Sequence, residues 1–183
     1  MTLQQHVTER LKITSKTKPL QKVQPATKAE LAALIKEEVN KQGPDADLNF
    51  IDTSLITDMS YLFSVGGFSI ENIKIDEWDV SNVKNMSHMF ISCRKFNCDL
   101  SRWNVVNLKI TAYMFSGCQN FNCDLSDWDV SNVTNMERMF ARCTKFKSDL
   151  SGWDVSNVIY NAEMFVSCPK MTKNPQLQPK FIH

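Results

Sequence analysis

The stretch WDVSNVTNMERMF, residues 128–140, recurs almost unchanged at three other places in the chain. WDVSNVKNMSHMF begins at Trp78, WNVVNLKITAYMF at Trp103 and WDVSNVIYNAEMF at Trp153, so the copies follow one another every 25 residues without an insertion. Columns of methionine, phenylalanine and cysteine keep the same spacing. A fixed period of this length indicates stacked units, each of which cannot bury its apolar face alone.

Two different periodicities occur within one unit. Apolar residues alternate with polar ones through residues 121–126, which is the pattern of a strand with one buried face. Thr134 and Glu137 form a capping box, the signature of a helix start. After it, four residues keep the spacing of one helix face: Met136, Met139, Phe140 and Cys143. Each unit is therefore predicted to hold one short helix and one short parallel strand, the content of a leucine-rich-repeat coil.

The predicted fold class is α/β, a leucine-rich-repeat-like solenoid of about five coils of 25 residues with an N-terminal helical cap. The cap is expected near residues 28–42, where Thr27 and Glu30 form a capping box and Gly43 with Pro44 ends the helix. Four segments are predicted: a basic flexible leader at 1–26, the helical cap and the strand leading into the repeat at 27–50, the solenoid at 51–168, and a C-terminal cap or tail at 169–183.

Composition excludes several classes of protein. The 183 residues are 43% hydrophobic and 22% charged, and no apolar run approaches the roughly 20 residues of a membrane span. The first residues, MTLQQHVTERLK, show no secretory signal peptide. Residues 1–28 carry six Lys or Arg against one Glu, but without interleaved aromatic residues this basic leader does not predict nucleic-acid binding.

The repeat resembles a known family. MFSGCQNFNCDLSDWDVSNVTNMERMF, residues 114–140, is similar to the repeat of the bacterial BspA-like leucine-rich-repeat surface proteins, and TKAELAALIKEEV, residues 27–39, is similar to the segment that precedes it there. The resemblance covers residues 26–168. It implies a cell-surface or secreted protein with a role in adhesion or host contact. Without a visible signal peptide, a cytoplasmic location stays open.

The cysteines raise the question of a metal. Four of them form two pairs whose spacing suits zinc: Cys93, Cys98, Cys118 and Cys123. The repeat accounts for them without a metal, because later units keep one cysteine column and place Ser148 and Lys173 in the other. We expect free, buried thiols, with disulfide bonds between successive coils as the alternative. No metal site and no cofactor is predicted.

The candidate binding site is the outer face of the predicted strands. If the apolar residues point inward, the alternate polar residues point outward and stack from coil to coil. The predicted site consists of Asn97, Asp99, Ser101, Arg102, Asn122, Asp124, Ser126, Asp127, Lys147, Asp149 and Ser151. Its aspartates place like charges side by side along one face. Two arrangements could compensate for this repulsion: hydrogen bonds to nearby backbone N–H groups and serines, or a bound calcium ion. Arg102 and Lys147 stand where the columns vary, so partner choice is assigned to them.

No constellation for catalysis is visible, and no catalytic residue is assigned. None of the three histidines, His6, His88 and His183, has a neighbour fixed by the repeat that would act as nucleophile or orienting acid. The predicted function is a non-enzymatic interaction module for a protein partner, such as a host or matrix protein, acting as a monomer or weak homo-oligomer.

Two alternatives to this function stay open. One is an intracellular or secreted effector whose chemistry lies in the leader or tail, and the other is a structural, self-associating repeat protein. Should the strand face not bind, the alternative surface is the convex side around His88, Tyr113 and Arg138.

Overall fold

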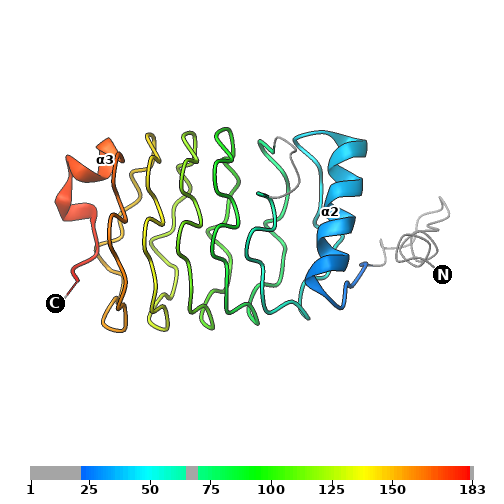
Figure 1. The fold of residues 1–183 in the computed structure, drawn as a ribbon, viewed down its shortest axis with the longest axis horizontal. Helices are drawn as coiled ribbons and strands as arrows, with labels where there is room; N and C mark the ends of the chain where they lie inside the picture. Colours follow the sequence, from blue (N-terminus) through cyan, green and yellow to red (C-terminus); the bar gives the residue numbers. More distant parts are fainter. Residues whose placement is uncertain (1–21, 65–69, 182–183) are drawn as a thin grey trace.

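The structure, a computed structural model, describes residues 22–64 and 70–181. The repeat units lie side by side along the long axis of the molecule (Figure 1). Helix α2 (Lys28–Gln42) lies at the N-terminal end of this stack, and helix α3 (Pro169–Thr172) lies at the other end, followed by the 3-10 helix η1 (Pro175–Leu177). The two ends of the stack are thus closed by different elements.

Helix α2 is the helix predicted near residues 28–42, and its ends form as the sequence indicates. The Glu30 N–H donates to Thr27 Oγ1 at 3.2 Å, and the Gly43 N–H donates to the Val39 carbonyl at 2.8 Å. Gly43 takes a positive φ of 89°, which glycine adopts readily at a helix end. The inner face of α2 is buried and comprises Leu31, Leu34, Ile35, Glu38 and Val39. Of the predicted leader, only residues 22–26 are described.

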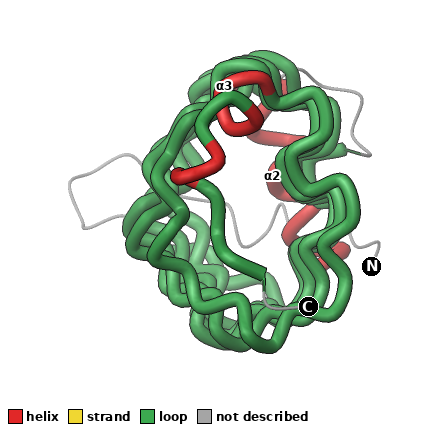
Figure 2. The backbone as a smooth tube through the Cα atoms, turned by 90° about the vertical axis from the view of Figure 1, so that its left-hand side faces the viewer, coloured by secondary structure: helices red, strands yellow, loops and turns green. Residues whose placement is uncertain are grey.

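The predicted solenoid architecture is wrong in its elements. Within residues 22–64 and 70–181 the only helices are α2, α3 and η1, so the expected short helix of each coil is absent. The expected parallel strands are absent from this part of the chain as well, because neighbouring units pair only through isolated bridges such as Asn85 with Ile110. The chain is therefore mostly turns and loops, not an α/β leucine-rich-repeat coil (Figure 2).

Hydrogen bonds between units explain why the predicted helix does not form. Alternate N–H groups of the 128–152 coil donate at 2.7–3.0 Å to carbonyls of the next coil: Met136 to Tyr160, Arg138 to Ala162, Phe140 to Met164 and Arg142 to Val166. Of the N–H groups between them, that of Glu137 donates to Asn135 Oδ1, and the others donate to the carbonyl three residues back, as Met139 does to Met136 at 3.1 Å. Arg138 and Arg142 have φ values of 50° and 60°. The segment is therefore a run of turns, with no N–H left for helical i to i−4 bonds.

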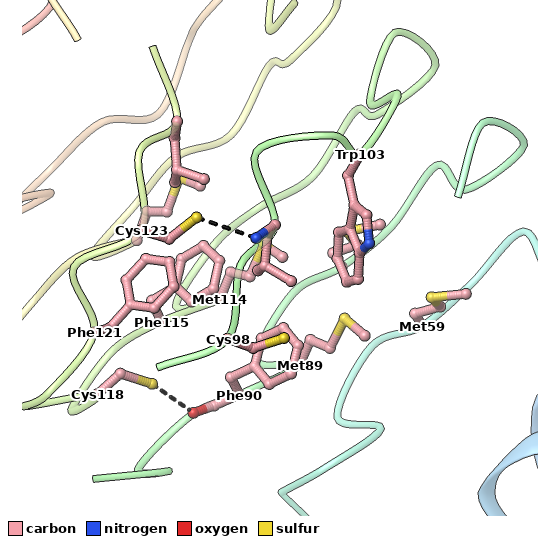
Figure 3. Close-up of a cluster of buried hydrophobic side chains, with 14 of the residues drawn as sticks. Met59, Met89, Phe90, Cys98, Trp103, Met114, Phe115, Cys118, Phe121 and Cys123 are labelled. Atoms are coloured by element: carbon pink, nitrogen blue, oxygen red, sulfur yellow. Dashed lines mark hydrogen bonds between the residues drawn. The ribbon is translucent and has the colours of Figure 1, made fainter. Parts of the chain in front are cut away.

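The opposite side of each coil is linked by side chains in place of a strand ladder. The Leu100 N–H donates to Cys123 Sγ at 3.1 Å, and the Leu125 N–H donates to Ser148 Oγ at 3.0 Å. Figure 3 shows the first of these bonds beside the buried rings of the core. The predicted alternation is nonetheless present, because Phe121 and Leu125 are buried while Asn122 between them is exposed.

Aromatic side chains stack along the core from coil to coil. Phe115 is fully buried, and its ring centroid lies 5.6 Å from that of Phe90 and 5.6 Å from that of Phe140. The Phe121 ring also stacks on the Phe115 ring, with centroids 4.2 Å apart (Figure 3). The tryptophans add polar links, since the Trp128 indole N–H donates to the Leu100 carbonyl of the coil before it at 3.0 Å. The backbone surrounds this core as a ring (Figure 2).

Candidate functional site

The predicted binding face lies on the side of the coils that side chains link together. Ten of its eleven residues are exposed, and the remaining one, Ser101, is partly buried. Equivalent residues of successive coils are joined by hydrogen bonds between positions 25 residues apart, so the columns stack in register. The structure therefore brings the predicted residues together on one surface.

The asparagine column of this face holds the coils together. Asn97 Oδ1 accepts the N–H of Asn122 at 3.0 Å, and Asn122 Oδ1 accepts the N–H of Lys147 at 3.1 Å. Each amide oxygen thus bonds a backbone group that a strand ladder would otherwise satisfy. These asparagines have a structural role, and a partner could reach only the remaining atoms of their side chains.

The aspartate column bonds its own backbone, as one of the two interpretations predicts. Asp124 Oδ1 accepts the Ser126 N–H at 3.0 Å and the Ser148 hydroxyl at 2.9 Å. Asp99 and Asp149 accept the N–H of the serine two residues on in the same way, at 2.9 and 3.0 Å. These hydrogen bonds lower the pKa of all three carboxyl groups, so the column is ionised at neutral pH.

Three residues of the face have uncommitted side chains. Arg102, Asp127 and Lys147 are exposed, and their side chains make no hydrogen bond or ion pair within the described part of the chain. They stand on a backbone that the asparagine and aspartate columns hold in place. Uncommitted charged groups on a fixed backbone are available to a partner without a loss of scaffold bonds.

A second surface lies on the turn side of the coils. Side chains one coil apart stack there into a continuous ladder, with ring centroids 4.4 Å apart for Tyr61 and His88 and 4.7 Å apart for His88 and Tyr113. The Arg138 guanidinium lies over the Tyr113 ring at 5.7 Å and pairs with the Glu163 carboxylate. All five residues have φ values between 50° and 60°. The alternative surface predicted around His88, Tyr113 and Arg138 is thus a real cluster, but it stands on left-handed turns and not on helices.

His88 is the titratable centre of this ladder. Burial lowers its pKa, and the nearby Glu137 carboxylate opposes that shift. Within the described residues His88 Nδ1 is buried without a hydrogen-bond partner. Glu137 is itself engaged, because its Oε1 accepts the Tyr113 hydroxyl at 3.0 Å. His6 and His183 lie outside the described residues.

The thiols are free, and most of them are buried. Of the six cysteines, Cys93 is partly exposed and the other five are buried. Burial raises the pKa of Cys93 and Cys123 to about 12, which keeps them protonated at neutral pH. In residues 22–64 and 70–181, no group of three or more His, Cys, Asp or Glu side chains could hold a metal ion. In the same residues, no helix is long and apolar enough to cross a membrane.

Comparison with protein families identifies the repeat. Residues 34–125 and 57–178 match a family described as Mycoplasma protein of unknown function, DUF285. The chain belongs to this DUF285 family. No curated protein and no solved structure matches the chain. The family match supports a repeat protein, as predicted, while the leucine-rich-repeat character expected from the resemblance does not describe this DUF285 structure.

Sequence reasoning missed two members of the DUF285 ladder. Tyr61 and Glu163 stand in the column of His88, Tyr113 and Arg138, but the column carries five positions of four residue types, so no repeated residue marks it. The signal that could have found it is chemical. Aromatic rings and paired charges follow one another in a column that is followed at each position by an apolar residue, Leu62 or a methionine.

Proposed function

We propose that this chain is a non-enzymatic protein-interaction module whose contact surface is the polar face of residues 97–102, 122–127 and 147–151. One observation carries the proposal: the exposed charges of Arg102, Asp127 and Lys147 are uncommitted, while the residues beside them are fixed by bonds to the scaffold. A partner would meet a rigid surface with a few adaptable charged groups. Surfaces of this kind bind with little ordering cost to the receptor.

The partner that fits this surface is a protein with basic and hydrogen-bonding groups. The aspartate column is ionised and stacked from coil to coil, so it presents acceptors for such groups. The similarity to the BspA-like surface proteins supports a partner outside the cell, such as a host or matrix protein. The proposed setting is accordingly the bacterial cell surface, with contact to a host as the role.

Charge reversal at the uncommitted positions tests the proposal. We expect Arg102→Glu and Lys147→Glu to leave the melting temperature nearly unchanged and to change affinity about tenfold or more, since each reverses a contact charge. The measurement is surface plasmon resonance against immobilised collagen, fibronectin and laminin. Lys84→Glu is the matched control, because Lys84 is an exposed lysine on the turn side of its coil. Equal binding by parent and both variants would remove the polar face from consideration.

Substitution of an aspartate tests separately whether this column stabilises the fold. Asp124→Ala removes the acceptor of two hydrogen bonds, and we expect it to lower the free energy of unfolding by about 1–2 kcal/mol. Stability loss without loss of binding would show that this column only supports the backbone. A joint loss of stability and binding in Asp124→Ala, with normal binding by Asp124→Asn, would indicate that backbone position matters to the partner.

A further inference from the structure

The last coil of the stack has an edge that no described residue covers. In the preceding coil, alternate N–H groups bond carbonyls of the next coil, as Arg138 does with Ala162 at 3.0 Å. Within residues 22–64 and 70–181, the equivalent N–H groups of the last coil have no acceptor; they belong to Asn161, Glu163, Phe165 and Ser167. This edge comprises residues 159–167 of the coil that precedes α3 (Figure 1).

The chain that follows this edge packs against the opposite, strand-like side of the stack. The Leu177 carbonyl accepts the Leu150 N–H at 2.8 Å, which places η1 beside the strand-like side of the coil before it. Helix α3 and the segment after it follow the same side and then pass across the end of the core (Figure 2). The turn side of the last coil is left open by this path.

The open edge offers donors, while most of its carbonyls are already bonded. The carbonyls of Tyr160 and Ala162 accept N–H groups of the preceding coil at 2.7 and 3.0 Å. The carbonyl of Glu163 accepts the Val166 N–H at 3.0 Å within the same coil. Two such edges cannot pair with each other through their main chains. The edge therefore suits a segment that presents carbonyls.

The side chains of this edge are more apolar than those of the interior coils. Six large hydrophobic residues are exposed in the described chain, and three of them lie here: Ile159 at 67%, Tyr160 at 59% and Val166 at 41%. Interior coils place Lys84 and Lys109 in the column of Ile159. End repeats of stacked proteins normally carry a polar outer face to remain soluble. An end coil that instead exposes apolar residues is typical of a surface that binds another molecule.

The matching carbonyls of a second copy of this chain lie beside α2. In this register they would be those of the first coil, around Asp58 and Ser60, at the end of the stack where α2 lies (Figure 1). Lys28 of α2 bonds the side chains there, at 2.6 Å to Ser60 Oγ and 3.4 Å to Asp58 Oδ1. A further copy could reach this edge only by passing α2 and the Lys28 bonds.

We propose that the 159–167 edge docks a main-chain segment of another protein, which presents alternate carbonyls to the four N–H groups and apolar side chains to Ile159, Tyr160 and Val166. The interior coils supply the template, since the same bonds form there between successive units. This is recognition by addition of a chain segment to an open backbone edge. It is independent of the polar face, which lies on the other side of the coils.

Amide hydrogen exchange of the full chain, measured by NMR with and without a peptide, tests this docking. The probe is a synthetic peptide of residues 128–143, whose own carbonyls accept such bonds within the chain. At millimolar peptide we expect exchange at Asn161, Glu163, Phe165 and Ser167 to slow by about tenfold, with no change at Arg138 or Phe140, which are already bonded. Unchanged exchange at the four edge amides would overturn the proposal.

Two controls separate docking from apolar adhesion. The double variant Ile159→Lys and Tyr160→Asn carries the residues that interior coils hold in these columns, such as Lys84 and Asn85, so it is compatible with the scaffold. It should lose the slowing, whereas Thr134→Lys, the same kind of change in an interior coil, should keep it. A scrambled peptide that slows the edge amides equally, or a double variant that binds like the parent, would overturn the proposal.

Discussion

Trp128→Ala is expected to lower the free energy of unfolding by about 3–5 kcal/mol, the range for truncating a large buried side chain. Trp128 is 3% exposed, and its ring stacks on that of Trp103 with centroids 6.5 Å apart. The substitution also leaves the Leu100 carbonyl without its indole donor. Urea denaturation followed by circular dichroism measures the change.

Trp128→Phe separates packing from hydrogen bonding at the same site. It keeps an aromatic ring in the stack but removes the indole N–H, so the Leu100 carbonyl keeps only the bond from the Trp103 N–H. We expect a cost of about 0.5–1.5 kcal/mol from that lost bond alone. Near-neutral results for both variants would mean that the tryptophan column does not join the coils, and the tryptophans would then become binding candidates.

Phe115→Ala is expected to be about as damaging, again by about 3–5 kcal/mol. Phe115 is fully buried and stacks on three other rings, those of Phe90, Phe121 and Phe140. Phe165→Ala is the matched control, because it truncates the same column in the last coil, where the ring is 7% exposed and, among the described residues, stacks on Phe140 alone. Differential scanning calorimetry should therefore show the larger fall in melting temperature for Phe115→Ala. Equal falls would contradict a core built by stacking from coil to coil.

The repeat spacing could be predicted from sequence because identical residues return every 25 positions. Helix α2 could be predicted for a local reason, since Thr27 and Gly43 act on backbone groups within a few residues of themselves. The outward orientation of the polar face followed from alternation alone, and the Asp124 bond to the Ser126 N–H is likewise local. Features that depend on bonds within one coil could therefore be predicted from the sequence.

The helix and strand of each coil could not be predicted, because the bonds that exclude them join different coils. The spacing of Met136, Met139 and Phe140 indicates which side chains are buried, and these residues are buried in the run of turns. It does not indicate which carbonyl accepts each N–H. The capping box is lost in the same way, since the Glu137 N–H donates to Asn135 Oδ1 at 2.9 Å, and Thr134 Oγ1 donates to the Lys109 carbonyl of the coil before it at 3.2 Å.

The left-handed residues carry no sequence signal either. Arg138 and His88 hold positive φ values that glycine or asparagine would ordinarily mark. Among the described residues of the coils, Gly117 is the one glycine with a positive φ, and a Cβ added there would lie 3.2 Å from the Ser92 Cα. In the interior coils the strain at the other positions is offset by bonds to the neighbouring coil, which become visible only when the coils are stacked.

Amide hydrogen exchange of the free protein tests most directly the claim that bonds between coils, and not helices, build this chain. In the interior segment 138–143, protection should be continuous, because alternate N–H groups bond the next coil and the rest bond three residues back. In the last coil, Met164, Val166 and Cys168 should be protected while Glu163, Phe165 and Ser167 exchange freely, since no coil follows within the described residues. A helix in each unit would instead protect both segments alike, and continuous protection through residues 163–168 would contradict this structure.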